Sequence, residues 1–219
     1  MTKEEQQVII SSYLGDSQWM RQKRKLRIKF GGYCKSYIEY KHSLITTMQK
    51  SKIWGSVNRK NILYEFTVGS SSFLDSLKES SFWEVEEKLD GINDLGLALL
   101  IFDDGTLNKN SNYYVLCIGK EYSCKFAQGF EKFINNKFSL HATKHKHPQC
   151  RGYNLQFKTC DTPKIANILT QYNNHDYKYK IPPSETIAKY ASRYKDIPKD
   201  LGGRKAYDIV RSSRKLEEK

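Results

Sequence analysis

The chain has 219 residues, 38% of them hydrophobic and 13% aromatic, which fits one large or two small folded domains and excludes a disordered tail. Lys and Arg number 37 against 24 Asp and Glu, so the net charge is +13, and this excess predicts an anionic partner. Because no apolar run is long enough to cross a bilayer and residues 1–6 do not resemble a signal peptide, nucleic acid is favoured over a membrane.

The first half of the chain is predicted to alternate helices with strands. Apolar residues between positions 8 and 14 indicate a short helix that ends at Gly15-Asp16-Ser17. In residues 21–32, apolar and basic residues then alternate, which is typical of a strand with one apolar and one basic face. The further predicted elements are a helix in residues 33–50, a turn at Gly55-Ser56, a strand in residues 61–69 and a short helix in residues 72–80.

The second half repeats this order of elements. An apolar helix ends at Asp103-Asp104-Gly105 and is followed by a polar loop, residues 106–112. A duplicated order with only two copies indicates an internal duplication rather than a solenoid. The remaining predicted elements are strands in residues 113–119 and 153–159 and helices in residues 124–138 and 162–172.

The duplication suggests a site for a metal ion. If the two opening helices pack side by side about a pseudo-twofold axis, Asp16 and Asp104 meet at their ends. Two adjacent carboxylates are unfavourable alone but suit a hard divalent cation. Gly-Asp-Ser and Asp-Asp-Gly are each common turn signals and alone predict no site. Both, however, end an apolar helix and precede a strand, and this shared position favours the metal site. Small residues that would allow the helices to approach closely are Ser11, Ser12, Gly96 and Ala98.

The cysteines and histidines give a weaker signal. The five cysteines are odd in number and lack CxxC spacing, so we expect reduced thiols. Residues 141–150, "HATKHKHPQC", could hold zinc, but no second ligand pair at matched spacing accompanies them. The basic residues within the run favour a surface loop. The candidate ligands are His141, His145, His147 and Cys150.

Two stretches, residues 9–17 ("IISSYLGDS") and residues 97–105 ("LALLIFDDG"), resemble motifs of the LAGLIDADG homing endonucleases. "LALLIFDDG" (residues 97–105) shares the leading Leu-Ala, the Leu-Ile pair and the closing Asp-Gly of the naming motif. "IISSYLGDS" (residues 9–17) is similar to the first motif of single-chain, two-motif members. "LRIKFGG" and "DYKYKIP" extend the resemblance over roughly residues 5 to 183. The motif glycine is replaced by Ser11 and Leu99, which predicts a looser or shifted helix crossing.

The resemblance implies an α+β fold of duplicated αββαββα type, with two antiparallel sheets forming a DNA-binding saddle. It implies subdomains at residues 1–92 and 93–183, followed by a basic helical extension at residues 184–219. As in single-chain members, the protein would be a monomer. The expected activity is that of a site-specific homing endonuclease that makes a staggered double-strand break in a long DNA target with Mg²⁺, using two or more ions.

The resemblance also assigns roles to residues. Asp16 and Asp104 become the catalytic, metal-binding carboxylates, and Lys180 matches a basic residue near the scissile phosphate. Gly15 and Asp103 complete the expected metal site, with Asp103 more suited to a supporting role. Lys78 and Lys88 are both candidates for the lysine of the other half-site. The residues expected to contact DNA are Arg24, Lys25, Arg27, Lys29, Lys144, Arg151 and Lys158.

Two other functions are compatible with the same sequence. One is a maturase that binds intron RNA, and the other is a DNA-binding derivative without catalytic activity. Because Asp16 and Asp104 are both present, the second alternative is disfavoured. We expect an intracellular protein. Its richness in Lys, Asn, Tyr and Ile indicates an A/T-rich genome, which fits mitochondria, chloroplasts, phages and many bacteria equally.

Overall fold

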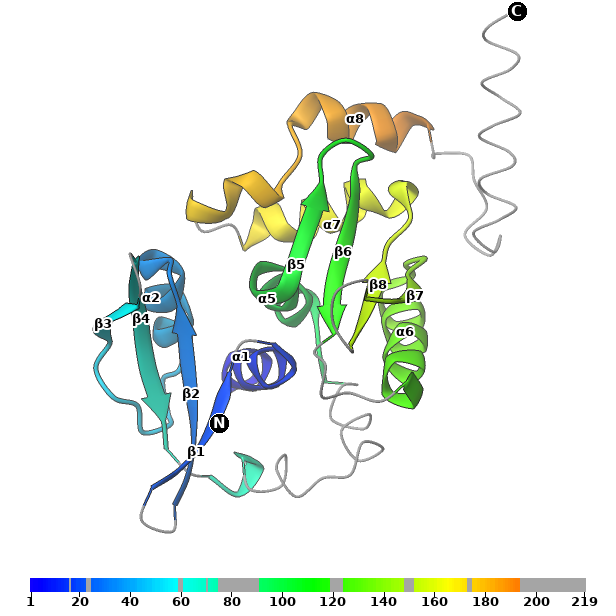
Figure 1. Cartoon of the computed structure of the whole chain (residues 1–219). Coiled ribbons are helices and arrows are strands. Elements are labelled where there is room, and N and C mark those ends of the chain that lie inside the picture. Colours follow the sequence, from blue (N-terminus) through cyan, green and yellow to red (C-terminus); the bar gives the residue numbers. More distant parts are fainter. Residues whose placement is uncertain are drawn as a thin grey trace, which may run out of the picture. The chain divides into compact units, whose positions relative to one another are not determined.

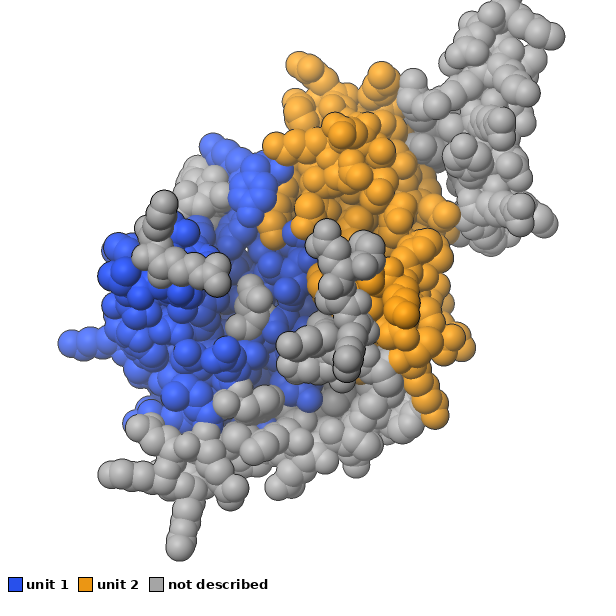
Figure 2. Space-filling model, in the orientation of Figure 1, with its two compact units in different colours: residues 1–105, 172–179 blue, residues 106–171, 180–219 orange. Residues whose placement is uncertain are grey.

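The computed structural model describes residues 1–15, 17–22, 25–58, 61–69, 71–74, 91–118, 124–147, 152–172 and 175–193. The chain forms two compact units (Figure 2). Unit 1 contains residues 1–105 and 172–179, and unit 2 contains residues 106–171 and 180–219. The subdomain boundaries after residues 92 and 183 stay a prediction. None of the helices in the described ranges is long and apolar enough to span a bilayer.

Unit 1 contains a four-stranded sheet with strand order β1-β2-β4-β3 (Figure 1). Helix α2 packs against β2 and β4, and helix α5 packs along α1. The strands pair in antiparallel fashion. The bounds are α1 (Lys3–Leu14), β1 (Gln18–Gln22), β2 (Lys25–Gly32), α2 (Lys35–Leu44), β3 (Trp54–Asn58), β4 (Asn61–Val68) and α5 (Asp94–Asp104).

Unit 2 repeats the same topology, with strand order β5-β6-β8-β7 and helix α6 against β7 and β8. The predicted α+β class, with two sheets built from a duplicated order of elements, is therefore confirmed. The bounds are β5 (Gly105–Asn108), β6 (Tyr113–Ile118), α6 (Cys124–Phe138), β7 (Thr143–Lys146), β8 (Tyr153–Gln156), η1 (Thr159–Asp161), α7 (Thr162–Gln171), η2 (His175–Lys180, shared between the units) and α8 (Ser184–Arg193).

Strand β2 has the predicted two faces. Ile28 and Phe30 are buried, and Phe30 stacks on Phe66 of β4 with the ring centroids 4.7 Å apart. Arg27 and Lys29 alternate with them and so lie on the opposite face of the sheet. Helix α2 contacts β2, whereas the basic face, the open face of the sheet, carries the partly exposed side chains of Arg27 and Lys29.

Four strands were not predicted as strands from the residue pattern: β1, β3, β5 and β7. Gly55 and Ser56, expected to form a turn, lie inside β3, and part of the expected loop 106–112 forms β5. Each of the four is an edge strand of its sheet. The helix predicted for residues 33–50 ends at Leu44, because the backbone N–H groups of residues 46–48 bind Glu5 instead.

Glu5 fixes the segment after α2 to the start of α1. Its buried carboxylate accepts hydrogen bonds from the backbone N–H of Thr2 (2.7 Å) and Thr46 (2.6 Å) and from the hydroxyl of Thr47 (2.6 Å). Burial alone raises the pKa of this carboxyl, but these bonds, led by those of Thr47, lower it to about 2. The charged form therefore stabilises the fold.

We expect Glu5→Gln to lower the free energy of unfolding at pH 7 by about 2–3 kcal/mol, because it weakens several bonds to a charged acceptor. The carboxyl has a pKa of 4.5 when unperturbed and about 2 in the fold, so its contribution is complete above pH 4.5 and declines toward pH 2. Urea denaturation at pH 7 and pH 3 will show a smaller difference between wild type and variant at the lower pH. The exposed neighbour provides the control, since Glu4→Gln changes stability little at either pH.

Candidate metal centre at the ends of α1 and α5

Helices α1 and α5 pack against each other (Figure 1). Ser11, Ser12, Gly96 and Ala98, the small residues predicted for this contact, are all buried. A Cβ added to Gly96 would overlap Oε1 of Gln7 and stand 2.8 Å from a methyl carbon of Ile92. A larger residue at position 96 would therefore require the side chains of Gln7 and Ile92 to move.

Gln7 of α1 connects this helix to the start of α5 by hydrogen bonds. Its buried amide donates to the carbonyl of Gly91 (2.8 Å) and accepts from the backbone N–H of Asn93 (2.9 Å). Asn93 in turn caps α5 through a side-chain bond from the N–H of Gly96. Sequence reasoning missed Gln7, because a single glutamine within an apolar helix gives no pattern.

The other ends of the same helices meet at Gly15 and Asp104. A Cβ at Gly15 would overlap Oδ2 of Asp104 and stand 3.2 Å from the Cβ of Asp103. Glycine at this position leaves room for the carboxylate of Asp104. Asp16 lies outside the described residues. The structure thus brings Asp104 to the end of α1, and the position of the Asp16 carboxylate stays a prediction.

Asp103 has a different environment from Asp104. Lys41 of α2 binds both of its carboxylate oxygens, at 2.6 and 2.7 Å, and the Tyr37 hydroxyl donates to Oδ1 at 2.8 Å. Both charged side chains are 2% exposed. Asp103 is thus held by protein donors, and both its supporting role and its binding of a metal stay predictions. Of the two adjacent aspartates, Asp104 is the better candidate for a cation ligand.

The expected catalytic lysine lies in unit 2. Lys180 is the last residue of η2 and is 6% exposed, and its carbonyl accepts a bond of 2.7 Å from the Tyr114 hydroxyl. Burial raises the pKa of Tyr114. The catalytic role of Lys180 stays a prediction. Lys78 and Lys88, the candidates for the other half-site, lie outside the described residues.

The residues expected to contact DNA have varied environments. Arg27 and Lys29 lie on the open face of β2, and Lys29 forms an ion pair of 2.7 Å with Glu65 of β4. Lys158 is exposed just beyond β8. Lys144 extends toward α6, where it donates to Sγ of Cys124 (3.0 Å) and lowers the pKa of that thiol. Arg24 and Arg151 and the side chain of Lys25 lie outside the described residues.

A pocket of about 570 Å³ lies beside the Lys29–Glu65 pair in unit 1. Gly31 and Gly32, the last residues of β2, help to line it and add no side chains of their own. Tyr33 and Tyr179, both more than half exposed, line it as well. The open sheet face therefore carries a pocket with aromatic side chains at its wall, next to Lys29, whose charge is neutralised by Glu65.

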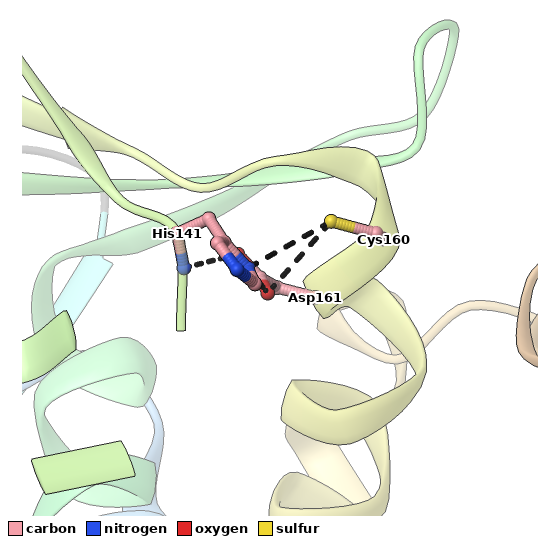
Figure 3. Close-up of side chains that lie close together, drawn as sticks. All are labelled: His141, Cys160 and Asp161. Carbon is pink, nitrogen blue, oxygen red and sulfur yellow. Dashed lines mark hydrogen bonds and ion pairs between the residues drawn. The ribbon is translucent and has the colours of Figure 1, made fainter. Parts of the chain in front are cut away.

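His141, Cys160 and Asp161 form a separate cluster in unit 2 (Figure 3). Asp161 accepts bonds from the backbone N–H of His141 (2.7 Å) and binds its Nδ1 (2.8 Å), and Sγ of Cys160 lies 3.9 Å from both partners. Zinc binds such ligand types, but hydrogen bonding accounts for the arrangement. His141 thus joins residues of η1, while His145 is exposed on β7 and Cys150 lies outside the described residues.

Comparison with known proteins identifies the class to which this fold and site belong. Residues 6–165 match the model of the LAGLIDADG DNA endonuclease family. The chain therefore belongs to the LAGLIDADG DNA endonuclease family. No curated protein sequence matches the chain.

Several solved structures share the fold. The homing endonuclease I-WcaI, bound to its DNA recognition sequence, is 18% identical with a TM-score of 0.65, over 83% of this chain and 87% of that one. I-DmoI in complex with DNA and Mn is 15% identical with a TM-score of 0.51, over 77% of this chain and 97% of that one. Full-length DUF199/WhiA from Thermatoga maritima is 12% identical with a TM-score of 0.55, over 97% of this chain and 66% of that one.

Proposed function

We propose that the protein is a site-specific homing endonuclease that cuts both strands of a DNA target with divalent cations. The observation that carries this proposal is the meeting of Asp104 with the end of α1 at Gly15, within a chain of the LAGLIDADG DNA endonuclease family. The motif match supports Asp16 as the second carboxylate.

The residues at this point suit Mg²⁺ chemistry. Asp104 supplies the oxygen ligand that Mg²⁺ prefers, and glycine at position 15 lets this carboxylate approach the end of α1. A bound divalent cation would activate a water and neutralise the charge on the phosphoryl oxygens. Asp104 and Asp16 would hold the ions, and Lys180 would lie near the scissile phosphate. One carboxylate per strand is consistent with a staggered break.

Double-stranded DNA is the partner that the charges favour. The net charge of +13 and the basic face of β2 would neutralise phosphates and provide salt-dependent affinity. I-WcaI and I-DmoI, which share the fold, were solved with DNA. We propose that a monomer binds the duplex, because one chain carries both motifs.

A cleavage assay on a library of randomised duplexes tests this function. We expect a single class of targets to be cut in Mg²⁺, with staggered ends and no cutting in EDTA. Because DUF199/WhiA shares the fold without being named an endonuclease, binding without cutting is a meaningful outcome. Specific DNA binding without cleavage would identify a non-catalytic derivative, and preferential binding of structured intron RNA would identify a maturase.

The Lys29–Glu65 ion pair gives a prediction for DNA affinity. Because Glu65 already neutralises Lys29, this lysine contributes little to binding phosphates. Glu65→Gln is expected to free its charge, so that the slope of log K against log salt becomes steeper by about 0.9. Fluorescence anisotropy with non-specific duplex DNA over a salt series measures this slope.

The matched control is Glu39→Gln on α2. Glu39 pairs with Lys35 at 3.4 Å, so the substitution changes the net charge equally, but on a helix and not on the open sheet face. Its slope is expected to stay near that of the wild type. Equal slopes for the two variants would show that Lys29 does not reach the DNA backbone.

A further inference from the structure

One buried ammonium joins three helices at the proposed cation site. Lys41 of α2 is 2% exposed, and its Nζ binds both carboxylate oxygens of Asp103 on α5 and the hydroxyl of Ser12 on α1 (3.2 Å). The ring of Tyr37 lies 4.7 Å from the same nitrogen. A lysine is buried this completely only where charged and polar partners compensate for lost hydration.

The contacts of Lys41 distinguish two adjacent acids. Asp103 and Asp104 are consecutive residues at the end of α5, yet Lys41 and Tyr37 hold the carboxylate of Asp103 while that of Asp104 lies against Gly15. The charge of Asp103 is thereby cancelled inside the protein. Of this pair, Asp104 is the one whose carboxylate lies at the meeting point of α1 and α5.

The same contacts set the position of the helix end. Because Asp103 is held through both oxygens, its backbone cannot rotate without breaking a buried ion pair, and Asp104 follows directly in the chain. The bond from Lys41 to Ser12 connects this turn to α1, four residues before Asp16. Buried ion pairs are commonly no more stabilising than apolar residues of similar size, so stability alone does not require one here.

We propose that Lys41 is a positioning residue of the cation site: by holding Asp103 against α2, it fixes the turn that carries Asp104 and so sets the affinity for the divalent cation. This inference rests on the proposed function, because it assigns the cation to Asp104. Lys41 acts through Asp103 and does not itself touch the ion.

The test uses a charge-balanced double variant, Lys41→Met/Asp103→Leu. It removes one positive and one negative charge and substitutes apolar side chains, so the fold can be retained while the positioning contacts are lost. Binding of Mn²⁺, measured by the EPR signal of the free ion, is expected to weaken at least about 10-fold, a loss of about 1.4 kcal/mol. The Mg²⁺ concentration for half-maximal cleavage is expected to rise by the same factor.

Two further variants complete the design. Lys35→Met/Glu39→Leu removes an exposed pair from the same helix with the same change of charge, and its cation affinity is expected to equal that of the wild type. Tyr37→Phe removes one hydroxyl from Asp103 and keeps the ion pair, so it retains the fold if the double variant does not. It is expected to weaken Mn²⁺ binding two- to five-fold.

The outcomes separate this inference from the proposed function. If the wild type cuts DNA and the double variant keeps wild-type cation affinity, Lys41 is merely structural and the inference is overturned. If the wild type does not cut, but the double variant and Tyr37→Phe both bind Mn²⁺ more weakly, the endonuclease proposal fails and the positioning role stands. A wild-type protein that neither cuts nor binds Mn²⁺ would overturn both.

Discussion

Replacing Asp104 by Asn is expected to abolish DNA cleavage, with a fall of at least about 1,000-fold in the single-turnover rate. An amide is a neutral and weaker ligand than a carboxylate, so the variant loses the charge that holds a divalent cation at the end of α5. Stabilisation of the transition state by such an ion is worth several kcal/mol, and each 1.36 kcal/mol corresponds to a factor of ten in rate. The side chain keeps its shape, so the fold and DNA binding are expected to change little.

Rates measured at saturating enzyme, with DNA affinity measured separately in Ca²⁺, will distinguish lost chemistry from lost binding. The control is Asp94→Asn, an exposed acid at the opposite end of α5 that carries the same change of charge. This variant is expected to cut within about two-fold of the wild-type rate, because its charge is screened by solvent. Cleavage by Asp104→Asn at a rate near that of the wild type would exclude Asp104 as a metal ligand.

Replacing Gly96 by Val is expected to lower the free energy of unfolding by about 3 kcal/mol. The added carbon would overlap Oε1 of Gln7, whose two hydrogen bonds to residues 91 and 93 prevent it from moving aside, and would meet Ile92. Overpacking of this kind costs about 1–3 kcal/mol, and loss of the buried glutamine bonds adds to it. Because α1 and α5 would separate, cleavage is expected to fall as well.

Urea denaturation monitored by circular dichroism measures the effect. Gly129→Val, a change of the same type in the middle of α6 at a position that is only partly buried, serves as the control. It is expected to alter stability by less than about 1 kcal/mol, because valine is no poorer a helix former than glycine. Equal losses in the two variants would show that the insertion of valine into a partly or fully buried helix position, and not the α1–α5 contact, determines the effect.

The site was predictable where its residues form local motifs. The two apolar helices, their acidic ends and the small residues at positions 11, 12, 96 and 98 are all visible in short stretches of sequence. The polar residues that connect these helices and strands to one another could not be predicted in this way. Gln7, Lys41 and Glu65 act through residues 84, 62 and 36 positions away, and a single buried polar residue leaves no periodic signal in its own helix or strand. Long-range pairing of this kind appears only when the chain is folded.

The strands show the same division. By itself, the sequence determined the four central strands β2, β4, β6 and β8, because these strands lie between neighbours and bury apolar side chains such as Ile28, Phe66 and Leu116. Only the tertiary structure decided the four edge strands. β3, with its exposed Val57, forms a strand because β4 offers unpaired backbone groups beside it. Alternation of apolar and polar residues in a sequence indicates that one face of a strand is buried. An edge strand can form without such burial, because its backbone hydrogen bonds to the neighbouring strand are sufficient.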